Sequence, residues 1–262
     1  MPETRILMFD SGVGGISVFK DIKARLPWVS VTYAFDNQAY PYGELAQEEL
    51  VDRVDHYVQH FIETQSISLV VIACNTASTV VLPRLREKFS IPIVGVVPAI
   101  KPASQRANLG VGLIATPATV TREYTHDLIK DFAKDKDVKM IGTTELVDMA
   151  EQKLRGIDVD LTVLEQVLQP LKGNIDVAVL GCTHFPLLRS EICQVLGNEV
   201  TLVDSGDAIS RRVEFLLNEV SVTRFSNKLS YDVYCSAEPY SRSALQSSFT
   251  ELGFSEIKIQ PL

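Results

Sequence analysis

The stretch LVVIACNTAS, residues 69–78, decides the fold. Its apolar run, Leu69–Ala73, suits a strand covered on both faces, and the polar residues that follow it can open a helix. The same order returns at VAVLGCTHFP, residues 177–186, after the apolar run Val177–Gly181. Short apolar runs alternate with amphipathic stretches along the whole chain, which predicts an α/β protein with mostly parallel strands.

Eight apolar runs carry the strand pattern. They are Arg5–Phe9, Val31–Phe35, Leu69–Ala73, Ile93–Val97, Val111–Ala115, Val138–Ile141, Val177–Gly181 and Val200–Val203. The clearest helix lies between Glu44 and Gln65, where apolar residues recur at helical spacing. Tyr231, Val233 and Cys235 alternate with polar residues and predict an edge strand.

Short internal matches suggest two similar α/β halves that face each other. Strand ends carry Ala-Cys-Asn-Thr at 73–76 and Gly-Cys-Thr-His at 181–184. Phe-Asp-Ser-Gly at 9–12 is echoed by Val-Asp-Ser-Gly at 203–206. The segment 95–103, GVVPAIKPA, contains two prolines and is the predicted crossing between the halves.

Composition excludes several classes of function. The chain has 262 residues, with 25 basic against 33 acidic side chains and a formal net charge of −8. Without a basic cluster, this charge argues against a nucleic-acid surface and against anionic lipid. No apolar run approaches the ~18 residues that span a bilayer, and the N-terminus lacks a secretory pattern. We expect a soluble cytoplasmic protein in which the four cysteines stay reduced.

Two polar clusters at strand ends are rich in potential backbone donors. Asp10–Gly15, DSGVGG, is a turn of the kind that binds anions at a helix N-terminus. A dinucleotide site is the weaker interpretation, because Ser17 takes the third glycine position and Asp10 is negative; a plain turn capped by Asp10 and Ser11 is the other alternative. In the second cluster, Tyr40–Gly43, backbone N–H groups and the Tyr42 hydroxyl could bind a carboxylate, or the segment is simply a turn.

The other two clusters each contain a cysteine where a strand passes into a helix. The positive end of a helix dipole lowers a thiol pKa there, and ionising a thiol of pKa ~8.5 at pH 7 otherwise costs roughly 2 kcal/mol. Asn75 and Thr76 add donors beside Cys74, and His184 can hold or pass a proton beside Cys182. The alternatives are ordinary packing for Cys74 and a zinc ligand for Cys182, which lacks a partner set.

Four further residues favour structural interpretations. Cys193 and Cys235 are predicted to serve packing alone. His56 and His60 are four apart but fall on the polar face of the predicted helix, where solvation is expected. Glu151 stands four residues before Arg155, so an ion pair along a helix is its default interpretation.

Two cysteines at matching places favour one mechanism. A stereocentre with a weakly acidic C–H is inverted when one thiolate removes its proton and a thiol returns a proton on the opposite face. Asp10 and His184 would set the protonation of the two thiols. A Cys–His hydrolase explains only one cysteine. A non-catalytic protein that binds a small dicarboxylate, built on the same two halves, is the second hypothesis.

Four motifs together resemble the glutamate racemase family, within the aspartate/glutamate racemase superfamily. They are FDSGVGGISV at 9–18, YPYGE at 40–44, ACNTAS at 73–78 and GCTHFPLL at 181–188. The resemblance implies cofactor-independent interconversion of L- and D-glutamate, with D-glutamate supplied for peptidoglycan. It also implies an active site in the cleft between two similar domains, residues 1–97 plus 207–262 and residues 98–206. No cofactor, metal, nucleic acid or membrane is expected, and the chain is expected to form a homodimer. An aspartate racemase is the nearest alternative.

The same resemblance assigns roles to individual residues. Cys74 would act on D-glutamate with help from Asp10, and Cys182 on L-glutamate with help from His184. LVDMAE at 146–151 is similar to the family segment with an acidic helper, which makes Glu151 a further catalytic candidate. Besides Asp10, Cys74, Cys182 and His184, the predicted substrate-binding residues are Ser11, Pro41, Tyr42, Gly43, Asn75, Thr76, Thr116, Thr119 and Thr183. Ala115-Thr116 departs from the usual Gly-Thr of the family.

Overall fold

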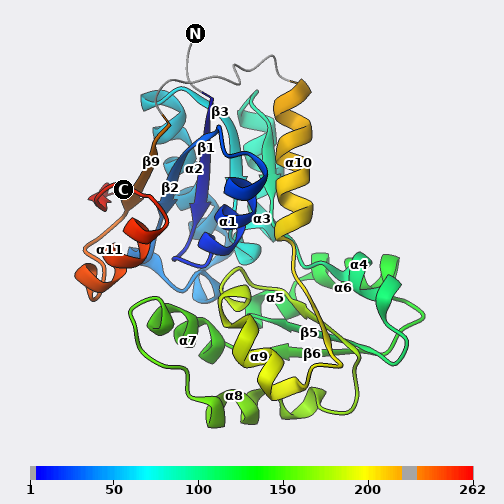
Figure 1. Cartoon of the computed structure of the whole chain (residues 1–262). Helices are drawn as coiled ribbons and strands as arrows, with labels where there is room; N and C mark the ends of the chain where they lie inside the picture. Colours follow the sequence, from blue (N-terminus) through cyan, green and yellow to red (C-terminus); the bar gives the residue numbers. More distant parts are fainter. Residues whose placement is uncertain (1–3, 220–228, 262) are drawn as a thin grey trace. The chain divides into compact units, whose positions relative to one another are not determined.

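The computed structural model describes residues 4–219 and 229–261 (Figure 1). The chain divides into two compact units, Met1–Val96 with Gly206–Leu262, and Val97–Ser205. Each unit is built on its own sheet, and every strand pairing in both sheets is parallel. The fold is therefore mixed α/β with parallel sheets flanked by helices, as predicted. Among the described residues, no helix is both long enough and apolar enough to cross a membrane.

The first unit has a six-stranded sheet in the order β10-β9-β2-β1-β3-β4. Its strands are β1 (Arg5–Asp10), β2 (Ser30–Phe35), β3 (Ile67–Ile72), β4 (Ile93–Gly95), β9 (Tyr231–Cys235) and β10 (Lys258–Ile259). Its α-helices are α1 (Ile16–Arg25), α2 (Gln47–Thr64), α3 (Asn75–Lys88), α10 (Gly206–Glu219) and α11 (Arg242–Glu251). Two short 3-10 turns, η1 (Asn37–Ala39) and η2 (Tyr42–Glu44), follow β2.

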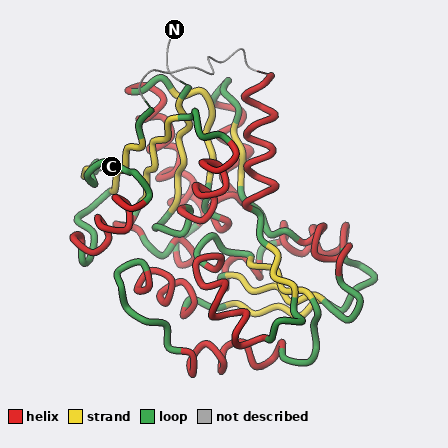
Figure 2. The backbone as a smooth tube through the Cα atoms, viewed as in Figure 1, coloured by secondary structure: helices red, strands yellow, loops and turns green. Residues whose placement is uncertain are grey.

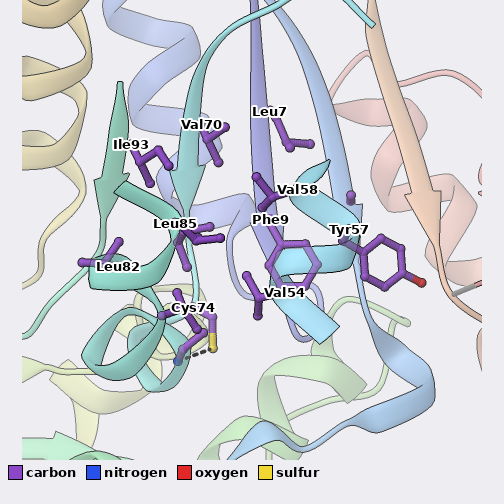
Figure 3. Packing of buried hydrophobic residues seen from close by; sticks show 14 of the residues in the cluster. Leu7, Phe9, Val54, Tyr57, Val58, Val70, Cys74, Leu82, Leu85 and Ile93 are labelled. Carbon is purple, nitrogen blue, oxygen red and sulfur yellow. Dashed lines mark hydrogen bonds between the residues drawn. The ribbon is translucent and has the colours of Figure 1, made fainter. Parts of the chain in front are cut away.

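Helices cover both faces of this sheet. Helices α2 and α3 pack on one face, where the apolar side of α2 meets the central strands β1 and β3 (Figure 3). Helices α1, α10 and α11 lie on the other face (Figure 1). Because β1 and β3 are buried on both sides, their central residues, Ile6–Phe9 and Leu69–Ile72, are consecutive apolar residues rather than an alternating pattern. Their carboxyl ends lie side by side at one edge of the sheet, which is where the first group of candidate residues is found.

The second unit has a four-stranded sheet in the order β6-β5-β7-β8 (Figure 2). Its strands are β5 (Val111–Ala115), β6 (Val138–Gly142), β7 (Val177–Leu180) and β8 (Thr201–Val203). Its α-helices are α4 (Ile100–Arg106), α5 (Pro117–Thr121), α6 (Glu123–Phe132), α7 (Glu145–Lys153), α8 (Leu161–Leu168) and α9 (Arg189–Leu196), with 3-10 turns η3 (Gln169–Leu171) and η4 (Phe185–Leu188). Apolar residues of α4 and α6 pack against β5 and β7 in its core.

All eight predicted strands are present, with small shifts at their ends. The strand predicted to run to Val97 ends at Gly95, and the strands predicted to include Ala73 and Gly181 end one residue earlier. The prediction of an edge strand at Tyr231–Cys235 is wrong, because the two-residue strand β10 pairs beyond β9. The alternation of β9 has another cause, since only one of its faces is fully covered.

Candidate functional site

The first group of candidate residues lies where β1 and β3 end. The backbone N–H of Ala73 donates to the Phe9 carbonyl at 2.7 Å, which holds the two strand ends together. Immediately beyond them, the Ser11 hydroxyl lies 3.6 Å from the sulfur of Cys74. The structure thus brings Asp10, Ser11 and Cys74 into one buried cluster, although 63 positions separate the serine and the cysteine.

Cys74 is the N-cap residue of α3. Its sulfur accepts the backbone N–H of Ala77 at 3.4 Å, and its side chain is buried at the end of the apolar cluster between α2, α3 and the sheet (Figure 3). A sulfur in this position faces the positive end of the helix dipole, which favours the thiolate. The cysteine therefore serves both as the cap of α3 and as a potential base.

The carboxylate of Asp10 is fixed by the glycine-rich turn that follows it. One oxygen accepts the N–H of Ser11 at 2.7 Å, and the other accepts the N–H of Gly15 at 2.6 Å, just before α1. A Cβ on Gly15 would lie 2.8 Å from the Tyr33 hydroxyl and 2.9 Å from the Ala73 Cβ, so the close approach requires glycine. The turn thus uses the N–H of Gly15 to bind its own aspartate, whereas the dinucleotide interpretation would give it to a phosphate.

The segment containing Tyr42 and Gly43 follows a cis peptide bond before Pro41. The Tyr42 hydroxyl donates to Asp36 at 2.8 Å, and burial together with the Asp36 charge holds the pKa of Tyr42 well above its ordinary value. In this structure the single proton of the hydroxyl is donated to Asp36, and binding of a substrate carboxylate by this hydroxyl stays a prediction. Within residues 4–219 and 229–261, the backbone N–H groups of Tyr42 and Gly43 have no acceptor, so these groups are the donors that this segment offers.

Asp36 and Arg53 form a buried ion pair that the sequence analysis did not identify. Arg53 donates through Nε to one oxygen of Asp36 at 2.6 Å and through Nη2 to the other at 3.0 Å. With the Tyr42 hydroxyl on the same carboxylate, the pair anchors the 40–44 segment to the end of β2. Asp36 follows β2 and Arg53 lies on α2, 17 positions later. Neither the strand pattern nor the helix pattern in the sequence predicts that these two residues pair.

The first turn of α3 contains a donor that lacks a partner. The side-chain amide nitrogen of Asn75 is buried, and no hydrogen-bond acceptor lies within reach of it among the described residues. The next residue in the sequence, Thr76, is also buried. An orphaned buried donor is costly, which marks Asn75 as a group that a ligand would satisfy.

Ser78 has a structural role that the sequence left unassigned. Its hydroxyl donates to the Ile72 carbonyl at 3.0 Å and accepts the Val96 N–H at 3.1 Å. One buried side chain thereby ties the start of α3 to β3 and to the segment after β4, which fixes the helix start that carries the thiol of Cys74.

The second group of candidate residues follows β7. Gly181 comes directly after the strand, and a Cβ there would lie 2.8 Å from Leu113 Cδ1 and 3.0 Å from the Ile114 carbonyl oxygen. The chain therefore passes close to β5 before it reaches Cys182, Thr183 and His184, all three of which are buried. Sequence had placed these residues at a strand end, and the glycine explains how they fit there.

A continuous hydrogen-bond chain runs from Cys182 to Arg155. The Cys182 sulfur lies 3.7 Å from Nδ1 of His184, whose Nε2 lies 2.9 Å from one oxygen of Glu151. The other Glu151 oxygen accepts from Nη1 of Arg155 at 2.6 Å. The ion pair with Arg155 that the spacing predicted is therefore present, and the other oxygen of the same carboxylate contacts the candidate residue His184.

The environment of His184 favours its charged form. Burial by itself would lower the pKa of this imidazole, but hydrogen bonds to Cys182 and Glu151 and the negative charges on both outweigh it. The pKa of His184 is consequently raised well above its ordinary value. At neutral pH the ring holds a proton that it can direct at the Cys182 sulfur.

Thr116 and Thr119 lie at the end of β5 in the same unit. The Thr116 hydroxyl caps α5 by accepting the Thr119 N–H at 3.3 Å, and the two hydroxyl oxygens are 3.0 Å apart. The structure thus joins these two candidates to each other by a direct contact.

The remaining sequence predictions concern residues outside both groups. Cys235 is fully buried, as expected for packing, whereas Cys193 is half-buried and its thiol donates to the Asn198 side chain at 3.3 Å. His56 is exposed and His60 half-buried against Phe61. Among residues 4–219 and 229–261, no group of three or more His, Cys, Asp or Glu side chains is arranged to hold a metal ion.

Comparison with known proteins defines the class. The family model for Asp/Glu/Hydantoin racemase matches residues 16–213. The chain is 58% identical to the glutamate racemase of Vibrio vulnificus over 260 residues, which cover 99% of this chain and 98% of that protein. The structure of Escherichia coli glutamate racemase, solved with L-glutamate and the activator UDP-MurNAc-ala, is 46% identical, has a TM-score of 0.93 and covers 99% of both chains. The Francisella tularensis glutamate racemase, solved with D-glutamate, is 25% identical with a TM-score of 0.81, covering 98% of this chain and 97% of that one.

The fold and the matched motifs define an isomerase of the racemase class. The chain belongs to the Asp/Glu/Hydantoin racemase family. Its resemblance to glutamate racemases extends over nearly its whole length, as the four sequence motifs indicated. Membership of a racemase family favours catalysis over the alternative of a non-catalytic dicarboxylate-binding protein.

Proposed function

We propose that this enzyme interconverts L- and D-glutamate by moving the α-proton between two thiols, without a cofactor. The observation that carries the proposal is the repeated arrangement of the two cysteines. In each unit a buried thiol follows the carboxyl end of a central parallel strand and contacts a polar side chain, Ser11 at Cys74 and His184 at Cys182. The relatives that the chain matches over nearly their full length, named glutamate racemases, support glutamate as the substrate.

The chemistry requires a base on one face of Cα and an acid on the other. With D-glutamate, the Cys74 thiolate takes the α-proton and becomes a thiol, and the electron pair of the C–H bond passes into an enolate-like carbanion. The Cys182 thiol then delivers its proton to the opposite face and becomes a thiolate, which yields L-glutamate. The reverse reaction exchanges the two roles, so no net proton is consumed.

The helpers differ between the two thiols, and so do their proposed roles. Asp10 is held beside Ser11, whose hydroxyl contacts the Cys74 sulfur, so we assign Asp10 to assist proton transfer at Cys74. His184 lies beside Cys182 with Nδ1 facing the sulfur, so we assign it to assist proton transfer at Cys182. Glu151 acts through His184.

We assign substrate binding first to hydrogen-bond donors that have no acceptor among the described residues. The amide of Asn75 and the backbone N–H groups of Tyr42 and Gly43 are suited to carboxylate oxygens. Other groups proposed to contact substrate are the remaining predicted binding residues Ser11, Pro41, Thr76, Thr116, Thr119 and Thr183.

We further propose a cytoplasmic homodimer whose D-glutamate supplies peptidoglycan synthesis, as the family resemblance implies. A reducing compartment suits the mechanism, because both catalytic sulfurs must stay out of disulfides, and none of the four cysteines forms a disulfide in the described structure. We assign the two units as the two domains of the enzyme.

Proton exchange tests the proposal directly. The purified enzyme in deuterated buffer is expected to replace the α-proton of L- and D-glutamate with deuterium, followed by NMR, without any added cofactor. Cys74→Ser and Cys182→Ser are each expected to abolish racemisation, while Cys193→Ser, the matched control, keeps it. Full turnover in either of the first two variants would contradict the mechanism. Faster exchange of aspartate than of glutamate would instead contradict the assigned substrate.

A further inference from the structure

Arg155 stands at the far end of the hydrogen-bond chain that begins at Cys182. Its Nη1 donates both to the side chain and to the backbone carbonyl of Glu151, each at 2.6 Å. The Arg155 and Glu151 side chains are only 10% and 16% exposed. An ion pair on a solvated helix face contributes little, but this pair is largely shielded from water.

The two bonds of Arg155 restrict where the Glu151 carboxylate can lie. One bond ties the guanidinium to the backbone of α7, and the other ties it to the carboxylate, so the glutamate side chain is held against its own helix. A free glutamate side chain samples many rotamers, and ordering one costs up to about 2 kcal/mol of entropy. Because the two bonds from Arg155 already order the Glu151 side chain, its second carboxylate oxygen is held in position to contact Nε2 of His184.

The orientation of His184 depends on that carboxylate. When Nε2–H is bound to Glu151, Nδ1 is the ring nitrogen that faces the Cys182 sulfur. A carboxylate behind a histidine fixes the orientation of the ring in this way. Arg155 also places a positive charge 2.6 Å from the Glu151 carboxylate.

We propose that Arg155 is a positioning residue for proton transfer at Cys182, acting through Glu151 and His184. This inference rests on the proposed two-thiol mechanism. It assigns to Arg155 a role in one of the two proton transfers and none at Cys74. The sequence spacing alone favoured a surface ion pair, and the second contact of Glu151 with His184 is what changes the interpretation.

The test compares Arg155→Met with Arg155→Lys, and with Arg106→Met as the matched control at an exposed arginine of α4. We expect Arg155→Met to lower kcat/KM about 10- to 100-fold, as for groups that orient a functional histidine from behind. Arg155→Lys, which keeps the charge, should recover part of the loss. The control should match the parent enzyme.

Isotope effects separate positioning from simple structural damage. The equilibrium constant of racemisation is fixed, so kcat/KM must fall equally for both enantiomers. The primary isotope effect need not change equally. With 2-deuterated L-glutamate, whose deuteron goes to Cys182, the effect should rise in Arg155→Met; with 2-deuterated D-glutamate it should fall. Damage that merely reduces the amount of active enzyme leaves both effects unchanged, and that result would overturn the proposal.

A double variant provides an independent test. If Arg155 acts through Glu151, Arg155→Met should cost little further activity in a Glu151→Gln background. Two full, multiplying losses would overturn the proposal. If Arg155→Met fails to fold, the same pair of isotope effects is measured in Arg155→Lys, and unchanged effects there would overturn the proposal. Failure of the proposed function is distinguishable, because the parent enzyme itself would then show no α-proton exchange.

Discussion

Removing Arg53 should destabilise the first unit more than removing the aspartate that it binds. Asp36 is fully buried and receives two hydrogen bonds from Arg53, at 2.6 and 3.0 Å, besides the Tyr42 hydroxyl. Breaking a buried pair from one side leaves an uncompensated charge, which costs about 3–5 kcal/mol. Since the Arg53 side chain is itself 20% exposed and Tyr42 remains, we expect Arg53→Met to cost about 3 kcal/mol, at the lower end.

Asp36→Asn should cost less, about 1–2 kcal/mol, because the buried group is then neutral and Arg53 can turn to water. The double variant Arg53→Met with Asp36→Asn has no uncompensated buried charge. This double variant should therefore be more stable than Arg53→Met alone. Arg84→Met is the matched control. Arg84 is 51% exposed, and its partner Asp55 keeps an ion pair with Lys88 at 2.8 Å, so the loss should stay below about 1 kcal/mol.

The pH dependence of the Arg53→Met effect has a defined sign. In the parent enzyme burial opposes ionisation of Asp36, but hydrogen bonds from Arg53, Ser236 and Tyr42 outweigh it and lower its pKa. The stabilisation that comes from the lowered pKa of Asp36 is fully present once the pH is above ~3.9, the pKa of an aspartate in the unfolded chain. It is therefore constant between pH 5 and 7. Without the arginine, burial raises the folded pKa, so destabilisation grows with pH. At pH 5 the charge penalty is limited to about 1.5 kcal/mol, because each pH unit above ~3.9 adds about 1.4 kcal/mol.

Urea unfolding at pH 5 and pH 7 measures these differences. The fluorescence of the single tryptophan, Trp28, reports on the first unit, since it lies between α1 and β2. A loss below 1 kcal/mol for Arg53→Met at pH 7, or a loss no larger than that of Asp36→Asn, would refute the reasoning. So would a penalty that is larger at pH 5 than at pH 7.

Two further substitutions test how the chain reaches the thiols. Gly181→Ala should destabilise the second unit by about 1–3 kcal/mol and lower the melting temperature, since its Cβ would meet the Ile114 carbonyl oxygen at 3.0 Å; an unchanged melting temperature would contradict the geometry. Ser78→Ala should cost about 1–3 kcal/mol in urea unfolding, because it leaves the buried Ile72 carbonyl and Val96 N–H without their shared partner; a neutral result would show that water or a backbone shift replaces the hydroxyl.

Local sequence was sufficient for the architecture. Parallel strands covered on both faces are short and mostly apolar, so the eight predicted strands were visible as short apolar runs between amphipathic stretches. The position of the polar clusters also follows, because the carboxyl ends of parallel strands share one edge of a sheet. This is why Cys74 and Cys182 could be singled out, each after such a run. The edge strand was misplaced because β10 has only two residues, too few to show a period.

The sequence by itself determined the elements, the matched thiols and the family. Tertiary structure decided which polar groups are already occupied. The Tyr42 hydroxyl is committed to Asp36, Asn75 keeps an unsatisfied amide, and Glu151 divides its two oxygens between His184 and Arg155. Periodicity reports which face of an element is buried, since burial is repeated along the chain. A hydrogen bond between residues 33 positions apart occurs once and depends on side-chain direction, so only the folded chain reveals it.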